Sequence, residues 1–356
     1  MAELLPGANA SPWPADVAAS APLYARFDSG WYADIARDGY GPPPPPGRES
    51  EHAFFPLYPY AARAIHLATG LEVFPSLLLV SWVSILLALP LFLEEANRRG
   101  VPREGSRALP FLLLYPSAFF LQAAYGDALF LLLALLAFRG LRGGRVAPAV
   151  LLGFLAGLCR APAAALGAGL AIAWWLEERG REERWRPRTL AAAALVGAAP
   201  LLGVLAHVLG IGWAKGEPGL FFRVMAAWPE RVAGGASGPA AFFGRLAQRV
   251  ASGEALAHPG LLVPYALAVL LLVLAVLQLR AGRPSDAAWM AALVAMPVLT
   301  GTDAGIPRYT VTVYPVALSL AAVLDGRPRL RLAWLAGSTA LLLFYAAKLV
   351  RWSFVS

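Results

Sequence analysis

Long runs of apolar residues, separated by short polar connections, cover the chain from residue 71 to the C-terminus. Many of these runs approach the roughly 20 residues that a helix needs to cross a bilayer core of about 30 Å. The pattern predicts an all-α, polytopic transmembrane helical protein with about ten membrane segments. These segments are Leu71–Leu93, Ala108–Ala124, Asp127–Phe138, Ala147–Leu158, Ala161–Leu176, Thr189–Trp213, Leu261–Leu279, Ala287–Thr300, Tyr309–Leu324 and Leu332–Val350.

Several of the segments are too short for a straight span, and we expect them to be tilted, broken or partly re-entrant where they pack on protein. The chain divides into an external N-terminal region, residues 1–70, and a multi-helix transmembrane domain, residues 71–356. A long loop at 214–260 belongs to the second part and contains the amphipathic stretches Phe221–Val232 and Phe242–Val250. Such stretches are typical of helices that lie flat at a membrane surface.

The composition agrees with a lipid environment. Hydrophobic residues make up 58% of the 356 residues and charged residues only 15%, whereas a soluble domain has about 45 to 50% and about 25%. We therefore predict a multi-pass integral protein of the cell membrane, in contact with membrane lipids.

The basic residues indicate how the chain is oriented. The net charge is +8, but the arginines gather in alternate short loops, at 98–107, 139–145, 179–188, 280–283 and 327–331. Cytoplasmic loops collect Lys and Arg, so these loops are expected inside the cell and the N-terminal region outside. This distribution argues against a nucleic-acid partner, which would require a basic stripe on one face.

Common motifs for soluble nucleotides and metals are absent from the sequence. It contains no GxxxxGK[ST] loop, no HExxH and no DxD pair, and its four histidines lack the spacing of metal ligands. Cys159 is the single cysteine, so an internal disulfide cannot form. We expect neither a cofactor nor a bound metal.

Carboxylates and aromatic rings are combined shortly before the first apolar segment, at Asp28, Trp31 and Tyr32. Carbohydrate sites use this mixture, because aromatic faces pack on sugar rings and a carboxylate accepts a hydroxyl proton. The alternative is an interfacial helix whose aromatic residues form a membrane belt. His52 precedes a turn rich in aromatic residues and proline and is a second candidate, although the same run is consistent with a structured loop entering a helix.

Further candidates lie where helices approach the predicted outer face. Tyr125 and Asp127 form one such corner, and Asp127 is either a substrate ligand or a helix N-cap. Arg160 interrupts an apolar stretch, and Arg308 stands beside Tyr309 at the start of another helix. An arginine at membrane depth costs about 2.5 to 3.5 kcal/mol and usually has a partner or a function such as phosphate binding. Each arginine is alternatively a snorkelling interfacial residue.

Five segments in order resemble the PIG-V-like mannosyltransferases, bacterial relatives of the second GPI mannosyltransferase within the GT-C class of membrane glycosyltransferases. They span about four fifths of the chain: FDSGWYADIARDGY (27–40), HAFFPLYP (52–59), YPSAFFLQAAYGDALFLLLALLAF (115–138), GLCRAPAAAL (157–166) and GIPRYTVTVYP (305–315). This sequence has Phe27 where the family commonly has tryptophan, and Gly126-Asp127 where serine and glutamate are usual. The family's transmembrane helix before the acidic loop is also not found here.

The resemblance implies an inverting glycosyltransferase that takes a sugar, expected to be mannose, from a polyprenyl-phosphate donor at the outer face of the membrane. The family's acidic residue falls on Asp28, which is then the expected general base. Arg160 and Arg308 are the expected ligands of the donor phosphate, and Trp31, Tyr32, His52, Tyr125, Asp127 and Tyr309 the expected substrate-binding residues. The acceptor is not identified by the sequence.

Two other functions fit the same pattern of apolar segments. A transporter or lipid flippase also has broken helices and intramembrane arginines, but its usual signature is a pair of similarly interrupted helices in two halves of the chain. The sequence shows no such symmetry. An inactive membrane protein derived from the GT-C class is the other alternative.

Overall fold

The computed structural model describes residues 22–100, 105–177, 182–228, 238–303 and 305–351, and in these ranges the regular structure is entirely helical. The α-helices are α2 (Ser29–Asp38), α3 (Leu57–Thr69), α4 (Val73–Arg99), α5 (Leu109–Leu113), α6 (Asp127–Arg142), α7 (Val146–Cys159), α8 (Ala163–Ile172), α9 (Pro187–Ala214), α10 (Leu220–Ala226), α12 (Pro239–Ala251), α13 (Glu254–Ala257), α14 (Val263–Arg280), α15 (Pro284–Thr300), α16 (Ile306–Thr312), α17 (Tyr314–Val323) and α18 (Pro328–Val350). Short helical turns at 51–53, 105–108, 118–121, 173–177 and 259–262 complete the list.

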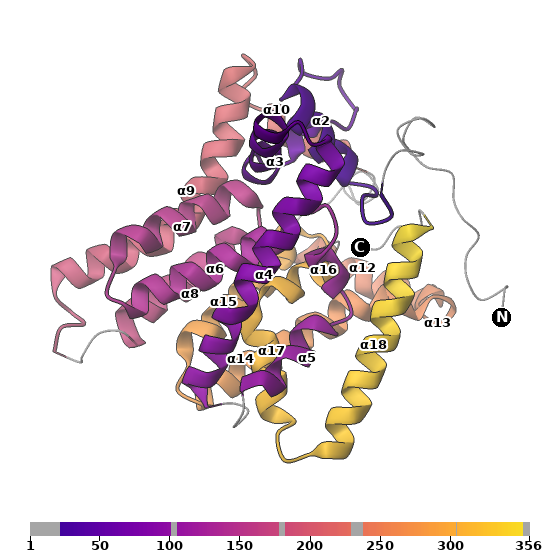
Figure 1. Ribbon diagram of the computed structural model, residues 1–356. Helices are drawn as coiled ribbons and strands as arrows, with labels where there is room; N and C mark the ends of the chain where they lie inside the picture. Colours follow the sequence, from indigo (N-terminus) through magenta and orange to yellow (C-terminus); the bar gives the residue numbers. More distant parts are fainter. Residues whose placement is uncertain (1–21, 101–104, 178–181, 229–237, 304, 352–356) are drawn as a thin grey trace.

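The long helix α4 runs through the middle of the molecule (Figure 1). Helices α6 to α9 pack on one side of α4, and α14, α15 and α17 lie toward its C-terminal end. Helices α2, α3 and α10 gather over one end of the bundle, and α18 stands along an edge (Figure 1). One hydrophobic cluster continues from α2 through the bundle, so the N-terminal helices share a core with the later ones.

Four helices of the described residues are long and apolar enough to cross a membrane: α4, α9, α14 with its preceding turn, and α18. A fifth is obtained if α16 and α17, which meet at an angle of 79°, are counted as one broken span. The protein thus has the character of a helical membrane protein. By helix length and composition, however, the number of spans is below the ten that the apolar pattern predicts.

Two of the expected segments are interrupted, and proline explains one of the breaks. The expected segment Ala108–Ala124 is not one helix but two short helical turns and α5. The expected segment Tyr309–Leu324 breaks at Val313, because Pro315 has no N–H with which to continue the helix. Hydropathy reports composition, whereas the break depends on one missing hydrogen-bond donor.

The outward faces of the candidate spans are covered with large apolar side chains. On α9 these include Leu195, Leu202 and Leu209, on α14 Val269 and Val273, and on α18 Leu343 and Phe344. Water-soluble proteins rarely expose patches of this extent. Lipid is the solvent that such a surface fits.

Glycines bring neighbouring helices into close contact. A Cβ atom added to Gly203 of α9 would lie 2.1 Å from the carbonyl oxygen of Phe154 in α7 and 2.9 Å from the Cα atom of Gly157. Helices in membranes commonly associate through small residues, because these allow the backbones to approach. This contact fixes the position of α7 relative to α9, and therefore also the position of Arg160 at the C-terminal end of α7.

The arginine-rich loops meet at the end of the bundle opposite α2 and α3. Arg139 and Arg142 in the last turn of α6 pair with Glu94 and Glu95 of α4 at 2.9 and 2.6 Å. Arg99 pairs with Glu95 and with Asp286 at the start of α15. These contacts bring together the surroundings of three arginine-rich loops, those at 98–107, 139–145 and 280–283, which are expected on one side of the membrane.

The close packing of α7 and α9 leads to a prediction about two glycines of the same helix. Gly203→Ala is expected to lower the free energy of unfolding by about 1 to 3 kcal/mol through overpacking. Gly210→Ala is the matched control, since a Cβ atom there meets no atom within 4 Å and alanine favours a helix by up to about 1 kcal/mol. Melting temperatures in detergent compare the two variants. Equal stability of both would contradict the close contact.

The arrangement of the loops predicts the sidedness of the protein. Pro46 lies in the exposed loop after α2, and Asp325 lies in the exposed turn between α17 and α18. In intact cells, Pro46→Cys should react with an impermeant thiol reagent, and Asp325→Cys should react only after lysis. The native Cys159 is buried and should stay unlabelled. Labelling in the reverse order would refute this orientation.

Candidate active site

Hydrogen bonds join three distant segments of the chain at the end of the bundle capped by α2. The Ser29 hydroxyl donates to the carbonyl oxygen of Ala124 at 3.1 Å, and the Tyr125 hydroxyl donates to the carbonyl oxygen of Arg26 at 2.9 Å. The hydroxyl of Ser117 donates to the carbonyl oxygen of Pro307 at 2.6 Å, which attaches α16 to the same region. Residues near positions 28, 127 and 308 therefore converge.

Asp28 stands immediately before α2, and its carboxylate points into the site. An aspartate in this position usually accepts a hydrogen bond from the first turn of its helix, but the Asp28 side chain makes no such bond. It accepts one instead from Nη1 of Arg308, 2.8 Å from Oδ2. Phe27, the preceding residue, has a positive φ of 50°, which is uncommon for a bulky residue and concentrates strain at this point.

Asp127 is the first residue of α6, and its side chain is completely buried. Its Oδ1 accepts a hydrogen bond from Nη1 of Arg160. Its Oδ2 accepts two hydrogen bonds from Arg308, at 3.0 Å from Nε and 2.9 Å from Nη2. The Asp127 carboxylate therefore pairs with the two arginines and does not cap α6. Because it lies in the first turn of α6, it is also at the positive end of the helix dipole, which favours a negative charge.

Gly126 allows Asp127 to lie so close to its neighbours. A Cβ atom at Gly126 would be 3.2 Å from Sγ of Cys159 and 3.4 Å from Cβ of Tyr58. The Cys159 thiol donates to the carbonyl oxygen of Gly126 at 3.3 Å. This packing places the residue before Asp127 directly against the residue before Arg160.

The two arginines are buried partners of the carboxylates, not snorkelling side chains. The side chains of Arg160 and Arg308 are 8% and 15% exposed, respectively. The Arg308 guanidinium carbon lies 4.4 Å from the ring centre of Tyr125, and that of Arg160 lies 5.2 Å from the ring centre of Tyr309. Cation–π contacts of this kind hold a guanidinium plane in place.

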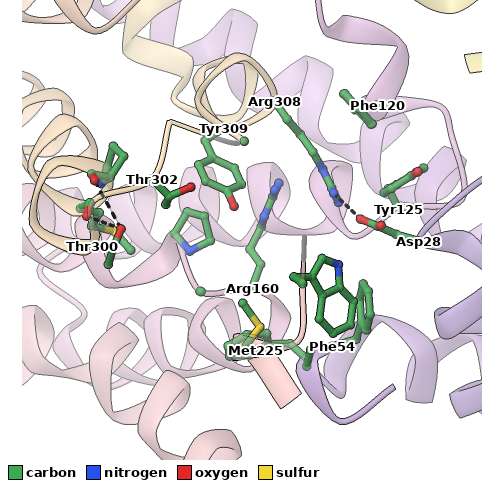
Figure 2. A pocket seen from close by; sticks show the side chains of 18 of the residues that line it. Asp28, Phe54, Phe120, Tyr125, Arg160, Met225, Thr300, Thr302, Arg308 and Tyr309 are labelled. Carbon is green, nitrogen blue, oxygen red and sulfur yellow. Dashed lines mark hydrogen bonds and ion pairs between the residues drawn. The ribbon is translucent and has the colours of Figure 1, made fainter. Parts of the chain in front are cut away.

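A cavity of about 350 Å³ opens beside these groups. Asp28, Tyr125, Arg160 and Arg308 lie close together around it (Figure 2). Away from them, its lining is mostly apolar and comes largely from the α2–α3 connection, α10 and its C-terminal end, α15 with the connection to α16, and the end of α18. The lining residues from these places include Phe54, Phe55, Phe221, Met225, Trp228, Leu293, Met296, Pro297 and Leu349.

Most of the residues expected from the sequence meet at this cavity, although Asp28 and Arg308 are 280 residues apart in the chain. Asp28, Tyr32, Tyr125, Arg160, Arg308 and Tyr309 all line it. Asp127 lies behind the arginines and does not belong to the lining. Trp31 stacks on Phe54, with ring centres 6.0 Å apart, and supports the wall from behind.

His52 is fully buried and outside the cavity lining. Its Nε2 lies 3.1 Å from the carbonyl oxygen of Gly41, which can only accept, so Nε2 carries the proton and Nδ1 accepts from the Ser50 hydroxyl at 2.7 Å. Burial lowers the pKa of His52 below its ordinary value. A neutral imidazole in these bonds orders the loop between α2 and α3.

The apolar wall includes residues that the sequence analysis did not single out. Phe54 and Phe55 belong to the HAFFPLYP run and were within reach of that analysis. Leu293, Met296 and Leu349 were not, because they belong to helices that are apolar on all sides and carry no local signal of which face meets a ligand. Within the described ranges, no group of three or more His, Cys, Asp or Glu side chains is arranged to hold a metal ion.

The chain matches no protein-family model, and no curated protein or solved structure shows significant similarity to it. The chemistry of the site must therefore be judged from its own geometry.

The buried position of Asp127 leads to a prediction for a pair of residues. Asp127→Asn should lower the free energy of unfolding by about 3 to 5 kcal/mol, because it leaves two arginines beside a neutral amide. Adding Arg160→Gln removes the arginine whose carboxylate partner was Asp127, while Arg308 keeps its pair with Asp28. Thermal unfolding of the single and double variants should therefore show a combined loss smaller than the sum of the two single losses. Simple additivity would mean that the pair is not energetically coupled.

Proposed function

We propose that this protein is a membrane glycosyltransferase that transfers a sugar, expected to be mannose, from a polyprenyl-phosphate donor to an acceptor hydroxyl with inversion. One observation carries the proposal: a carboxylate and two arginines share a cavity whose remaining walls are largely apolar. A polyprenyl-phosphate sugar has the same division into an anionic centre, a polar ring and a long apolar chain.

The charged end of the cavity suits the phosphate. Arginine matches phosphate with its planar fork of N–H donors, and two arginines meet within one site here. The apolar end, with Leu293 and Met296 of α15 and Leu349 of α18, suits the first isoprene units. Aromatic residues beside Asp28, among them Tyr32 and Phe54, offer faces on which a sugar ring packs.

In the proposed reaction, the acceptor oxygen attacks the anomeric carbon as the acceptor proton passes to Asp28. A bond forms between the acceptor oxygen and the anomeric carbon. The bond between that carbon and the phosphate oxygen breaks, and its electron pair leaves with the lipid phosphate. A positioned general base typically contributes 10² to 10⁴-fold to the rate. Arg160 and Arg308 stabilise the charge that grows on the departing phosphate.

This proposal includes a GT-C-like arrangement with about ten membrane segments, several of them short or broken, at the outer face of the cell membrane. The short apolar helices α6, α7, α8 and α15 would then supply the segments beyond the long candidate spans. They pack mainly on other helices, which is where incomplete spans are tolerated.

A transporter is less well supported, because buried aromatic rings fill the path between the two charged ends. Arg160 lies over Phe130, Phe130 contacts Trp289, and Trp289 contacts Tyr314. Tyr314 in turn lies beneath Arg99 of the opposite ion cluster. All three rings are essentially inaccessible. The candidate site therefore opens toward one end of the bundle, as an enzyme at one membrane face requires.

The assignment of Asp28 as the base is tested by Asp28→Asn, which keeps the size of the side chain and removes its basicity. Transfer of radiolabelled mannose from polyprenyl-phosphate mannose should fall by about 10²-fold or more, with protein yield unchanged. Asp34→Asn is the matched control, since Asp34 lies in α2, the helix that follows Asp28, with a side chain 55% exposed. Wild-type transfer by purified Asp28→Asn would refute the assignment.

A further inference from the structure

The residue expected to act as the base and the residue expected to bind phosphate are paired with each other. Nη1 of Arg308 lies 2.8 Å from Oδ2 of Asp28, while the other edge of the same guanidinium holds Asp127. With Arg160 included, two arginines and two aspartates form one neutral network. While this contact lasts, Oδ2 of Asp28 is occupied by the Arg308 guanidinium.

The two carboxylates differ in how firmly they are held. Asp127 is completely buried and accepts from both arginines, so displacing it would leave charges without partners in the interior. Asp28 is 28% exposed, lines the cavity and is bound by one hydrogen bond from Arg308. An incoming anion therefore replaces Asp28 and leaves Asp127 in place.

We infer that Arg308 exchanges partners during the reaction: the donor phosphate takes the Nη1 edge of Arg308 and releases Asp28 to accept the proton of the acceptor. This inference rests on the proposed function and adds to it an order of events. Donor binding would create the base, so that an acceptor arriving first would find Asp28 still paired. Arg308 thereby links binding to chemistry, and Asp127 is the positioning residue that keeps Arg308 at the cavity during the exchange.

The charges remain balanced through the cycle. The phosphodiester of the donor carries one negative charge and replaces the one negative charge of Asp28 at Arg308. After transfer, Asp28 carries the proton of the acceptor and no longer competes for Arg308. The lipid phosphate is then a monoester with a charge of about −1.5 to −2 at neutral pH, and the two arginines hold it. Loss of the proton from Asp28 and departure of the lipid phosphate restore the pair.

The exchange makes Asp28 a competitor of phosphate, and this can be measured as binding without any transfer. Farnesyl phosphate is the probe, and the neutral alcohol farnesol is the control ligand, with the full-length protein in detergent. Asp28→Asn should lower the dissociation constant for farnesyl phosphate by about tenfold, which corresponds to about 1.4 kcal/mol. Its affinity for farnesol should not change.

A second variant separates partner exchange from the simple removal of a nearby negative charge. Arg308→Lys keeps a positive charge beside Asp127 but lacks the planar guanidinium whose two edges hydrogen-bond two anions at once. In this background, the tightening caused by Asp28→Asn should shrink to about twofold or less, whereas general repulsion between Asp28 and phosphate would persist unchanged. An unchanged effect would overturn the inference, and so would the absence of tightening in Asp28→Asn itself.

The outcomes also distinguish this inference from the proposed function. Loss of transfer in Asp28→Asn without tighter binding of farnesyl phosphate would leave Asp28 as the base and refute the exchange. Tighter binding that depends on Arg308, with transfer retained, would support the exchange and refute the assignment of the base.

Discussion

The buried carboxylate of Asp127 is the interaction on which the site depends. It pairs with both Arg160 and Arg308 where water has little access, and a buried charge without a partner would cost several kcal/mol. Because its two oxygens are taken by two different arginines, Asp127 fixes the distance between the cations at the edge of the cavity. The segments that carry Asp28 and Arg308 are in turn attached to the region around Asp127 by hydrogen bonds from Ser29, Tyr125 and Ser117.

The helical scaffold explains how such a group can sit in an otherwise apolar protein. Glycines let α7 approach α9, and a layer of buried rings, including Trp289 and Tyr314, separates the site from the second ion cluster at the other end of the bundle. Helix α6 connects these two ends. Its first residue is Asp127, its last turn pairs with Glu94 and Glu95, and 16 residues give it a length of about 24 Å.

The sequence indicated which residues gather at the cavity better than it indicated how they are arranged there. A lone arginine within an apolar stretch is costly, so Arg160 was recognisable, and the five ordered segments pointed to Asp28 and Arg308. The sequence did not reveal that Asp28 and Arg308 are partners, because pairing between residues 280 apart depends on the packed fold. The same limit applies to His52, which orders a loop by hydrogen bonds that no local pattern discloses.

The helical class and the membrane character also followed from the apolar pattern, whereas the helix breaks did not. Hydropathy treats 108–124 and 309–324 as continuous, although Val313 and the missing N–H of Pro315 end one helix and begin another. The breaks have a consequence for the site, because the short helix α16 created in this way carries Arg308 and Tyr309.

The proposed reaction requires above all that Arg160 and Arg308 bind a lipid phosphate. The most direct test is a cryo-electron microscopy structure of the protein in nanodiscs with a bound polyprenyl phosphate. The phosphate should lie within hydrogen-bonding distance of Arg160 and Arg308, with Asp28 separated from Arg308 and the isoprene chain running past Leu293 and Met296. A phosphate bound elsewhere, for example among the arginines at the opposite end of the bundle, with the pair between Asp28 and Arg308 still intact, would contradict the account.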